Sequence, residues 1–165
     1  MDAARALGRE CAERGTTIVY GAGKVGLMGA LAEECLKGGG RIVGVIPRFM
    51  VERGWCHEGL TELVVTETMG ERKQVMRDRS DALIALPGGC GTLEELLEAI
   101  TQRQMTLYNH PIVIVNIGGY FDALLRWLER AEREGFMREQ PTVRKADSLW
   151  QVAGSVEEAL EYAGA

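Results

Sequence analysis

The sequence has few of the residues that hold metal ions or form disulfide bonds. It contains two histidines and four cysteines in 165 residues, and no two cysteines have the C-x-x-C spacing. Zinc sites and the disulfide frameworks of small domains both need clusters of such residues. Cys56 and His57 are adjacent, but no second pair with ligand spacing accompanies them. We therefore expect no metal site, and four reduced thiols, which are typical of a cytoplasmic protein.

An excess of positive charge and a long apolar run are also lacking. The chain carries 19 Lys and Arg against 24 Asp and Glu, for a net charge of −5. Proteins that bind nucleic acid broadly present a basic face, so we expect no nucleic-acid partner. No apolar run approaches the roughly 20 residues of a membrane span, and the first residues lack the apolar segment of a signal peptide. A membrane partner is not expected, and the predicted location is cytoplasmic.

Short apolar runs alternate with amphipathic stretches along the whole chain. Strands are expected at residues 16–20, 41–46, 63–66, 82–86, 111–116 and 149–152. Helices are expected at 2–14, 27–37, 68–79, 122–134 and 155–162 and after residue 92, with an irregular loop at 49–59. Strands that are apolar throughout are typical of a parallel sheet covered on both faces. The sequence predicts one α/β domain over residues 1–165, a Rossmann-like doubly wound parallel sheet flanked by helices.

Residues 81–100 form the stretch most suggestive of a site. An apolar strand is followed by the PGGCGT elbow (residues 87–92) and then by a helical pattern. Glycines allow a ligand to approach the backbone closely, and Thr92 is predicted to cap the helix, whose first N–H groups would point into the elbow. The helix dipole is positive there, so we expect an anion site at the carboxyl end of a buried strand.

A second glycine-rich turn, the GAGKVG elbow (residues 21–26), matches the dinucleotide pattern GxGxxG between a strand and a helix. That pattern also needs an acid at the end of the next strand, which here ends in Ile46 and Pro47. Binding of NAD is therefore not expected. A P-loop is excluded because Val25, not Ser or Thr, follows Lys24. Two roles remain open for the elbow: a tight strand-to-helix turn, or a position near a ligand.

Several charged or reactive residues allow a structural and a functional interpretation. Glu95 could complete a capping box with Thr92, which spacing alone favours, or could reach ribose hydroxyls or a water together with Glu94. Arg72 and Lys73 begin a basic helix, where the dipole disfavours cations and a bound anion would relieve the conflict. Cys90 at a helix start could be a nucleophile, but a small elbow residue is the favoured interpretation.

Other residues are given structural interpretations. Arg77 and Arg79 are expected on a solvated face, paired with Glu67, Glu71 and Asp78. Trp127 and Trp150 fit a core or an interface.

The segment PGGCGTLEE (residues 87–95) resembles the PGGxGTxxE signature of the LOG proteins, the cytokinin riboside 5′-monophosphate phosphoribohydrolases, long mislabelled lysine decarboxylases. Further segments are similar to landmarks of that family in the same order: Tyr20–Gly23, Gly26–Gly29, Gly44–Pro47, Met69–Lys73, Ile84–Leu86, Thr101 and Gly118–Phe121. The resemblance covers nearly the whole chain. Family members begin with a strand ahead of the first helix, and the numbered sequence starts at that helix.

The resemblance implies an enzyme that cleaves the N-glycosidic bond of (N6-modified) adenosine 5′-monophosphates, giving free base and ribose 5-phosphate. It implies no cofactor, a small-molecule nucleotide substrate and a homodimer. Arg72 and Glu95 would be catalytic. The substrate contacts that it implies are Glu52, Arg72, Lys73, Gly88, Gly89, Cys90, Gly91, Thr92, Leu93, Glu94, Glu95 and Thr101. Two alternatives remain: a molybdenum-cofactor carrier, which has a similar fold and glycine elbow, and a nucleotide-sensing dimer without catalysis.

Overall fold

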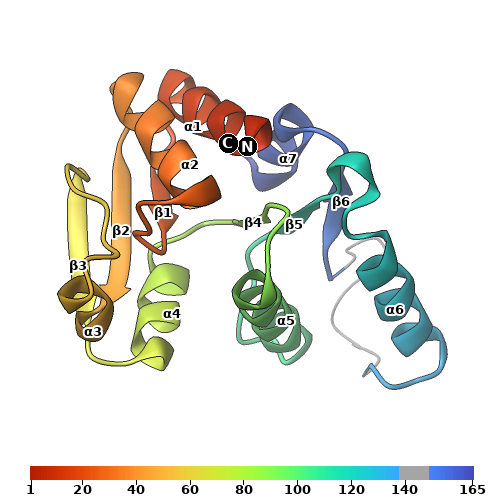
Figure 1. Cartoon of the computed structure of the whole chain (residues 1–165). Helices are drawn as coiled ribbons and strands as arrows, with labels where there is room; N and C mark the ends of the chain where they lie inside the picture. Colours follow the sequence, from red (N-terminus) through yellow and green to blue (C-terminus); the bar gives the residue numbers. More distant parts are fainter. Residues whose placement is uncertain (138–148) are drawn as a thin grey trace. The chain divides into compact units, whose positions relative to one another are not determined.

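The computed structural model describes residues 1–137 and 149–165. These residues group into two compact units, Met1–Asp81 with Ala165, and Ala82–Gly164. Each unit holds a three-stranded parallel sheet together with helices (Figure 1). The α/β fold class with parallel strands flanked by helices is therefore confirmed, whereas a single domain over residues 1–165 stays a prediction.

The first unit is built on a sheet with the strand order β1-β2-β3. Its elements are α1 (Asp2–Arg14), β1 (Ile18–Tyr20), α2 (Gly26–Lys37), β2 (Ile42–Pro47), α3 (Arg48–Glu52), β3 (Glu62–Thr66) and α4 (Met69–Asp78). All six residues of the central strand β2 are buried, in agreement with its continuous apolar sequence. Because the strands are parallel, the GAGKVG elbow, α3 and the start of α4 all follow the same edge of this sheet.

The helices α1 and α2 cross closely on the first unit. A Cβ atom placed on Gly8 would lie 3.0 Å from the backbone nitrogen of Cys35, so the crossing point has room only for glycine. Cys11 and Cys35 are both buried in these two helices. Burial raises the pKa of the Cys11 thiol to about 11. This thiol is therefore protonated and unreactive near neutral pH.

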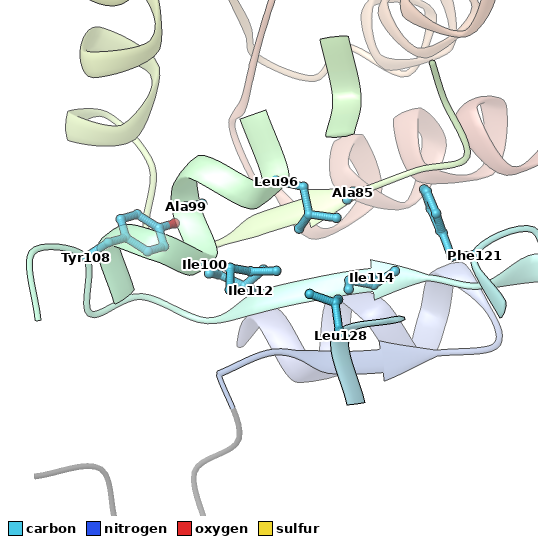
Figure 2. Close-up of a cluster of buried hydrophobic side chains, with 9 residues drawn as sticks. All are labelled: Ala85, Leu96, Ala99, Ile100, Tyr108, Ile112, Ile114, Phe121 and Leu128. Carbon is cyan, nitrogen blue, oxygen red and sulfur yellow. The ribbon is translucent and has the colours of Figure 1, made fainter. Parts of the chain in front are cut away.

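The second unit is built on a sheet with the strand order β4-β5-β6. Its elements are β4 (Leu83–Ala85), α5 (Cys90–Gln104), β5 (Ile112–Val115), the 3-10 helix η1 (Ile117–Gly119), α6 (Asp122–Arg133), β6 (Gln151–Ala153) and α7 (Val156–Ala163). Side chains of β5 alternate between two clusters. Ile112 and Ile114 pack with residues of α5 and α6 (Figure 2), and Val113 and Val115 pack with Ala159 of α7. Helices thus cover both faces of this sheet.

The structure corrects several local predictions. The loop expected at 49–59 is wrong in its first part, because Pro47 leads with φ −69 directly into the short helix α3. The strand around Ile84 is not buried on both faces, since only Ala85 of β4 is buried. Trp127 is 57% exposed, which excludes a core role, and Trp150 packs against the buried cluster that contains Ile112 and Ile114. The predicted cap of the last helix is confirmed, because the Ser155 hydroxyl accepts a hydrogen bond from the Glu158 N–H at 3.1 Å.

Within the described ranges, we find no helix that combines the length and the apolar character needed to cross a bilayer.

Candidate functional site

The PGGCGT elbow turns into helix α5 earlier than the sequence predicts. Gly89 is the N-cap, with φ −92 and ψ −157, and the first helical bond runs from the Leu93 N–H to the Gly89 carbonyl at 3.1 Å. Thr92 is therefore the third helical residue, and the prediction that it caps α5 is wrong. Its side chain packs instead against Gly88, where an added Cβ would lie 2.8 Å from the Thr92 Cβ. The capping box of Thr92 with Glu95 is wrong for the same reason.

The start of α5 lacks the features that cap other helices of the chain. Its N-cap Gly89 has no side chain that could bond the first N–H groups, and its first turn holds no acid. By contrast, α4 and α7 are capped by Thr68 and Ser155 and carry acids in their first turns. The helix α2 also lacks a side-chain cap. The N–H groups at the start of α5 therefore retain their positive partial charge, as phosphate sites at helix starts require.

The side chain of Tyr120, which lies outside the PGGCGT elbow in sequence, bonds to the backbone of that elbow. The Tyr120 hydroxyl donates to the Gly88 carbonyl at 2.8 Å. Because a peptide group is planar and trans, a fixed Gly88 carbonyl turns the Gly89 N–H to the opposite side. From the sequence, Tyr120 is recognised only as a family landmark, and its hydrogen bond to Gly88 was not predicted. The one available signal is its position just after β5, whose carboxyl end shares the sheet edge with the elbow.

The loop that carries Tyr120 is itself constrained. The Asn116 amide donates to Asp122 Oδ1 at 2.8 Å and accepts from the Phe121 N–H at 2.7 Å. Gly118 and Gly119 have φ of 63 and 71, a region that glycine adopts at little cost. The phenol is thus presented to the elbow by a fixed turn.

Helix α5 separates its core residues from its candidate site residues. Leu96 and Ile100 are buried, and Leu93 packs partly against the same cluster, so Leu93 has a core role in addition to its predicted one. Glu94 is exposed and Glu95 is half-buried, in the second turn of the helix. Thr101 is exposed, and its hydroxyl donates to the Leu97 carbonyl at 2.7 Å.

Arg72 is the buried cation of the first unit. It is the fourth residue of α4, a helix whose start is fixed by a hydrogen bond from the Glu71 N–H to the Thr68 hydroxyl at 3.0 Å. The side chain of Arg72 is 8% exposed, and its Nε donates to the Val45 carbonyl at 3.0 Å. Hydrogen bonds from a charged group are worth about 1.5–3 kcal/mol. The predicted conflict of this cation with the helix dipole is therefore relieved at least in part by a carbonyl of β2.

The other charged candidates of the first unit are more exposed. Glu52 ends α3 and is exposed, and Lys73 is half-buried beside Arg72. The pKa of Arg48 is raised by a hydrogen bond to Glu67 and, more weakly, by the charge of Glu52. Arg79 is exposed, as predicted, but it pairs with Glu62 and not with one of the acids predicted for it. Arg77 donates to Gln74.

The backbone of the GAGKVG elbow is largely used for structure. Gly23 forms an antiparallel bridge with Cys56. The Lys24 N–H donates to the Trp55 carbonyl at 3.2 Å, and the Ala22 carbonyl accepts from the His57 N–H at 2.8 Å. These bonds support the interpretation as a tight strand-to-helix turn. Cys56 and His57 join no group of three or more potential metal ligands in the parts of the chain that the structure describes.

Comparison with known proteins gives a consistent set of sequence relatives. Residues 28–163 match the family described as "Possible lysine decarboxylase". The probable cytokinin riboside 5′-monophosphate phosphoribohydrolase LOGL5 of Oryza sativa subsp. japonica is 46% identical over 135 residues, covering 82% of this chain and 55% of that protein. LOG1 of Arabidopsis thaliana, a cytokinin riboside 5′-monophosphate phosphoribohydrolase, is 43% identical, covering 87% and 66%. The protein of that name from Mycobacterium marinum is 44% identical, covering 83% and 73%. The chain spans 55 to 66% of the length of these two plant relatives.

Solved structures give a more distant likeness. The molybdenum cofactor binding protein from Rippkaea orientalis matches with a TM-score of 0.69 at 21% identity, covering 97% of this chain and 83% of that one. The molybdenum cofactor carrier protein from Chlamydomonas reinhardtii matches with a TM-score of 0.68, also at 21% identity, covering 97% and 82%. Likeness at this identity shows a common α/β fold and nothing about the ligand.

Replacing Tyr120 by Phe is expected to loosen the PGGCGT elbow. The substitution keeps the ring and removes the hydroxyl that bonds the Gly88 carbonyl, a bond worth about 0.5–1.5 kcal/mol. Backbone hydrogen exchange of the Leu93 N–H, which bonds the Gly89 carbonyl of the elbow at 3.1 Å, should become faster, while Ile112–Val115 of β5 should not change. Mass spectrometry of labelled peptides measures both.

The matched control is Tyr162→Phe, which removes a hydroxyl that donates to Glu158 at 2.8 Å in α7. This variant should leave exchange in the elbow unchanged. Equal exchange of the elbow in the Tyr120→Phe variant and the parent would show that the phenol does not hold it.

Proposed function

This chain belongs to the LOG family, described as "Possible lysine decarboxylase", and on that premise we propose that it is a nucleoside 5′-monophosphate phosphoribohydrolase. It would hydrolyse (N6-modified) adenosine 5′-monophosphates to the free base and ribose 5-phosphate. The observation that carries the proposal is the open start of α5 at Cys90, with the carboxylate of Glu95 in the following turn. Sequence identities of 41–46% to proteins named for this activity support it.

The reaction adds water across one bond. As the bond between the base nitrogen and the ribose C1′ breaks, its electron pair leaves with the base and the sugar gains oxocarbenium character. The carboxylate of Glu95 would stabilise that positive charge and orient the water whose oxygen bonds to C1′. The proton of that water leaves as the base takes one up, so the products are neutral base and ribose 5-phosphate. The residues alone supply this chemistry, and the proposal includes no cofactor.

Two groups would bind the anionic part of the substrate. The open N–H groups of the PGGCGT elbow suit a phosphate, because they combine partial positive charge with glycines that leave the backbone accessible. Arg72 would neutralise negative charge with its guanidinium. Lys73, Glu52 and Thr101 are proposed to make further contacts with the nucleotide.

Hydrolysis of AMP and isopentenyl-AMP tests the assignment directly. The parent protein should release free base, which chromatography detects. Glu95→Ala and Arg72→Ala should each lower kcat by roughly 100- to 10,000-fold, the range expected when a catalytic group is removed.

The matched controls are Glu129→Ala and Arg79→Ala, which remove the same charges from an exposed position of α6 and from the end of α4. Both should keep the parent rate. Release of base by Glu95→Ala at that rate would refute the role of Glu95, and a parent without any release would refute the activity itself.

Alkylation of Cys90 tests the anion site without catalysis. Cys90 is the exposed thiol, whereas burial raises the pKa values of Cys11, Cys35 and Cys56. Iodoacetamide at pH 8 should therefore react first at Cys90. Ribose 5-phosphate at ten times its dissociation constant should slow this reaction by about tenfold if occupied elbows are protected.

Ribose is the control ligand, because it lacks the phosphate, and Cys90→Ser shows by mass spectrometry which thiol reacts. Equal alkylation rates with ribose 5-phosphate and with ribose would argue against a phosphate site at the elbow.

A homodimer in the cytoplasm completes the proposal. Large apolar side chains that are strongly exposed in the single chain support an association, among them Leu107 at 72% and Phe136 at 81%. Light scattering should report twice the chain mass of 18.1 kDa. A mass of one chain at micromolar concentration would contradict the dimer.

The alternative of a molybdenum-cofactor carrier is supported by the fold alone. The solved structures of such proteins are 21% identical to this chain, below the level at which a ligand can be transferred. Sequence similarity favours the hydrolase. A carrier would release no base from either nucleotide.

A further inference from the structure

We propose that Gly21, the first glycine of the GAGKVG elbow, is a positioning residue for Arg72. The inference rests on the proposed function for its catalytic consequence, but the contact itself lies wholly within the first unit. It gives a physical reason for a glycine at this place in a pattern that does not serve a dinucleotide.

The guanidinium of Arg72 occupies the space that a side chain at position 21 would need. A Cβ atom built on Gly21 would collide with Arg72 Nη2 and lie 3.1 Å from Arg72 Cζ. Both residues are buried, so the arginine has no solvent-filled space beside it. The backbone of Gly21 itself does not require glycine, because its φ is not positive. Glycine is required at position 21 because any larger residue would occupy the space of the Arg72 guanidinium.

The second contact of the guanidinium comes from the neighbouring strand. The pairing of β1 with β2 ends at Tyr20 and Gly44. Gly21 follows the last residue of β1, and Val45 is the next residue of β2. Val45 supplies the carbonyl that accepts from Arg72 Nε at 3.0 Å. The guanidinium therefore lies just beyond the last β1–β2 pair, between a carbonyl that orients it and a glycine that admits it.

Gly23 of the same elbow does not have this role. A Cβ atom built on Gly23 would collide with Met28 Cε and lie 3.0 Å from Met28 Sδ, so its three nearest neighbours all belong to the side chain of Met28. Met28 is 43% exposed and flexible, so its thioether can move aside. Gly23→Ala is thus a matched control for Gly21→Ala: the same atom is added two residues away, against a neighbour that gives way.

A double-mutant cycle on thermal unfolding tests the contact without any assay of activity. Gly21→Ala should lower Tm by roughly 3–10 °C, as expected for an overpacked buried site. In the Arg72→Met background, where the guanidinium is gone and the apolar stem remains, the same substitution should change Tm by less than about 1 °C. Gly23→Ala should have the same small effect in both backgrounds.

The cycle also decides cases in which a variant does not fold. If Gly21→Ala is unfolded but Gly21→Ala with Arg72→Met is folded, the contact is supported. Equal losses of Tm in both backgrounds, or unfolding in both, would overturn the proposal, because they would show that position 21 needs glycine for another reason.

Hydrolysis of AMP tests the catalytic consequence. Gly21→Ala should lower kcat/KM by roughly 100-fold, the effect of a displacement of about 1 Å at a reacting site. It should add no further loss in the Arg72→Met background, whereas damage to the elbow alone would lower kcat/KM by the same factor in both. Gly23→Ala should retain the parent kcat/KM.

The two assays separate this inference from the proposed function. A parent protein that releases no base would refute the proposed reaction, and the Tm cycle would still decide whether Gly21 makes room for Arg72. Coupled Tm values with an unchanged kcat/KM in Gly21→Ala would overturn the positioning role.

Discussion

Parallel pairing of strands determines where the candidate residues of each unit lie. In a parallel sheet all strands end at the same edge, so the segments that follow them meet there although they are far apart in sequence. In the first unit this edge brings the GAGKVG elbow, the carbonyl of Val45 and the buried guanidinium of Arg72 together. In the second unit it brings the PGGCGT elbow and Tyr120 together. Both sets of contacts depend on the same backbone constraint.

The start of α5 differs from the starts of α4 and α7. Thr68 and Ser155 satisfy the first N–H groups of α4 and α7 with their hydroxyls, and acids in the first turns complement the dipoles. The start of α5 has a glycine N-cap and no acid. A side-chain cap stabilises a helix by about 1 kcal/mol, and α5 does without this stabilisation. Its first N–H groups, which directly follow the glycine elbow, are left available to a ligand. This contrast is the physical basis for the proposed phosphate site.

Rigidity around the two elbows comes from different interactions. Tyr120 fixes the peptide group after Gly88 through one phenol hydrogen bond, and the turn that carries it is fixed by Asn116. The GAGKVG elbow is held by backbone bonds to Trp55 and His57, and its first glycine leaves room for a cation. Preorganised donors and charges are what a glycosidic cleavage needs, because they do not have to reorient as the sugar becomes positive.

The sequence alone was sufficient to predict the type and order of most elements, the parallel α/β class and the family. Apolar periodicity and the PGGCGTLEE segment, on which these predictions depend, are properties of neighbouring residues. Tertiary structure decided the start of α5 at Cys90, the helix α3, the bond of Tyr120 to Gly88 and the position of Arg72 against Gly21. The last two depend on a group that arrives from a distant segment, whereas the start of α5 and the helix α3 depend on the path of the backbone at Gly89 and Pro47. The cap predicted at Thr92 failed because its side chain packs against Gly88. That contact is set by the turn of the chain and cannot be seen in the spacing of Thr92 and Glu95.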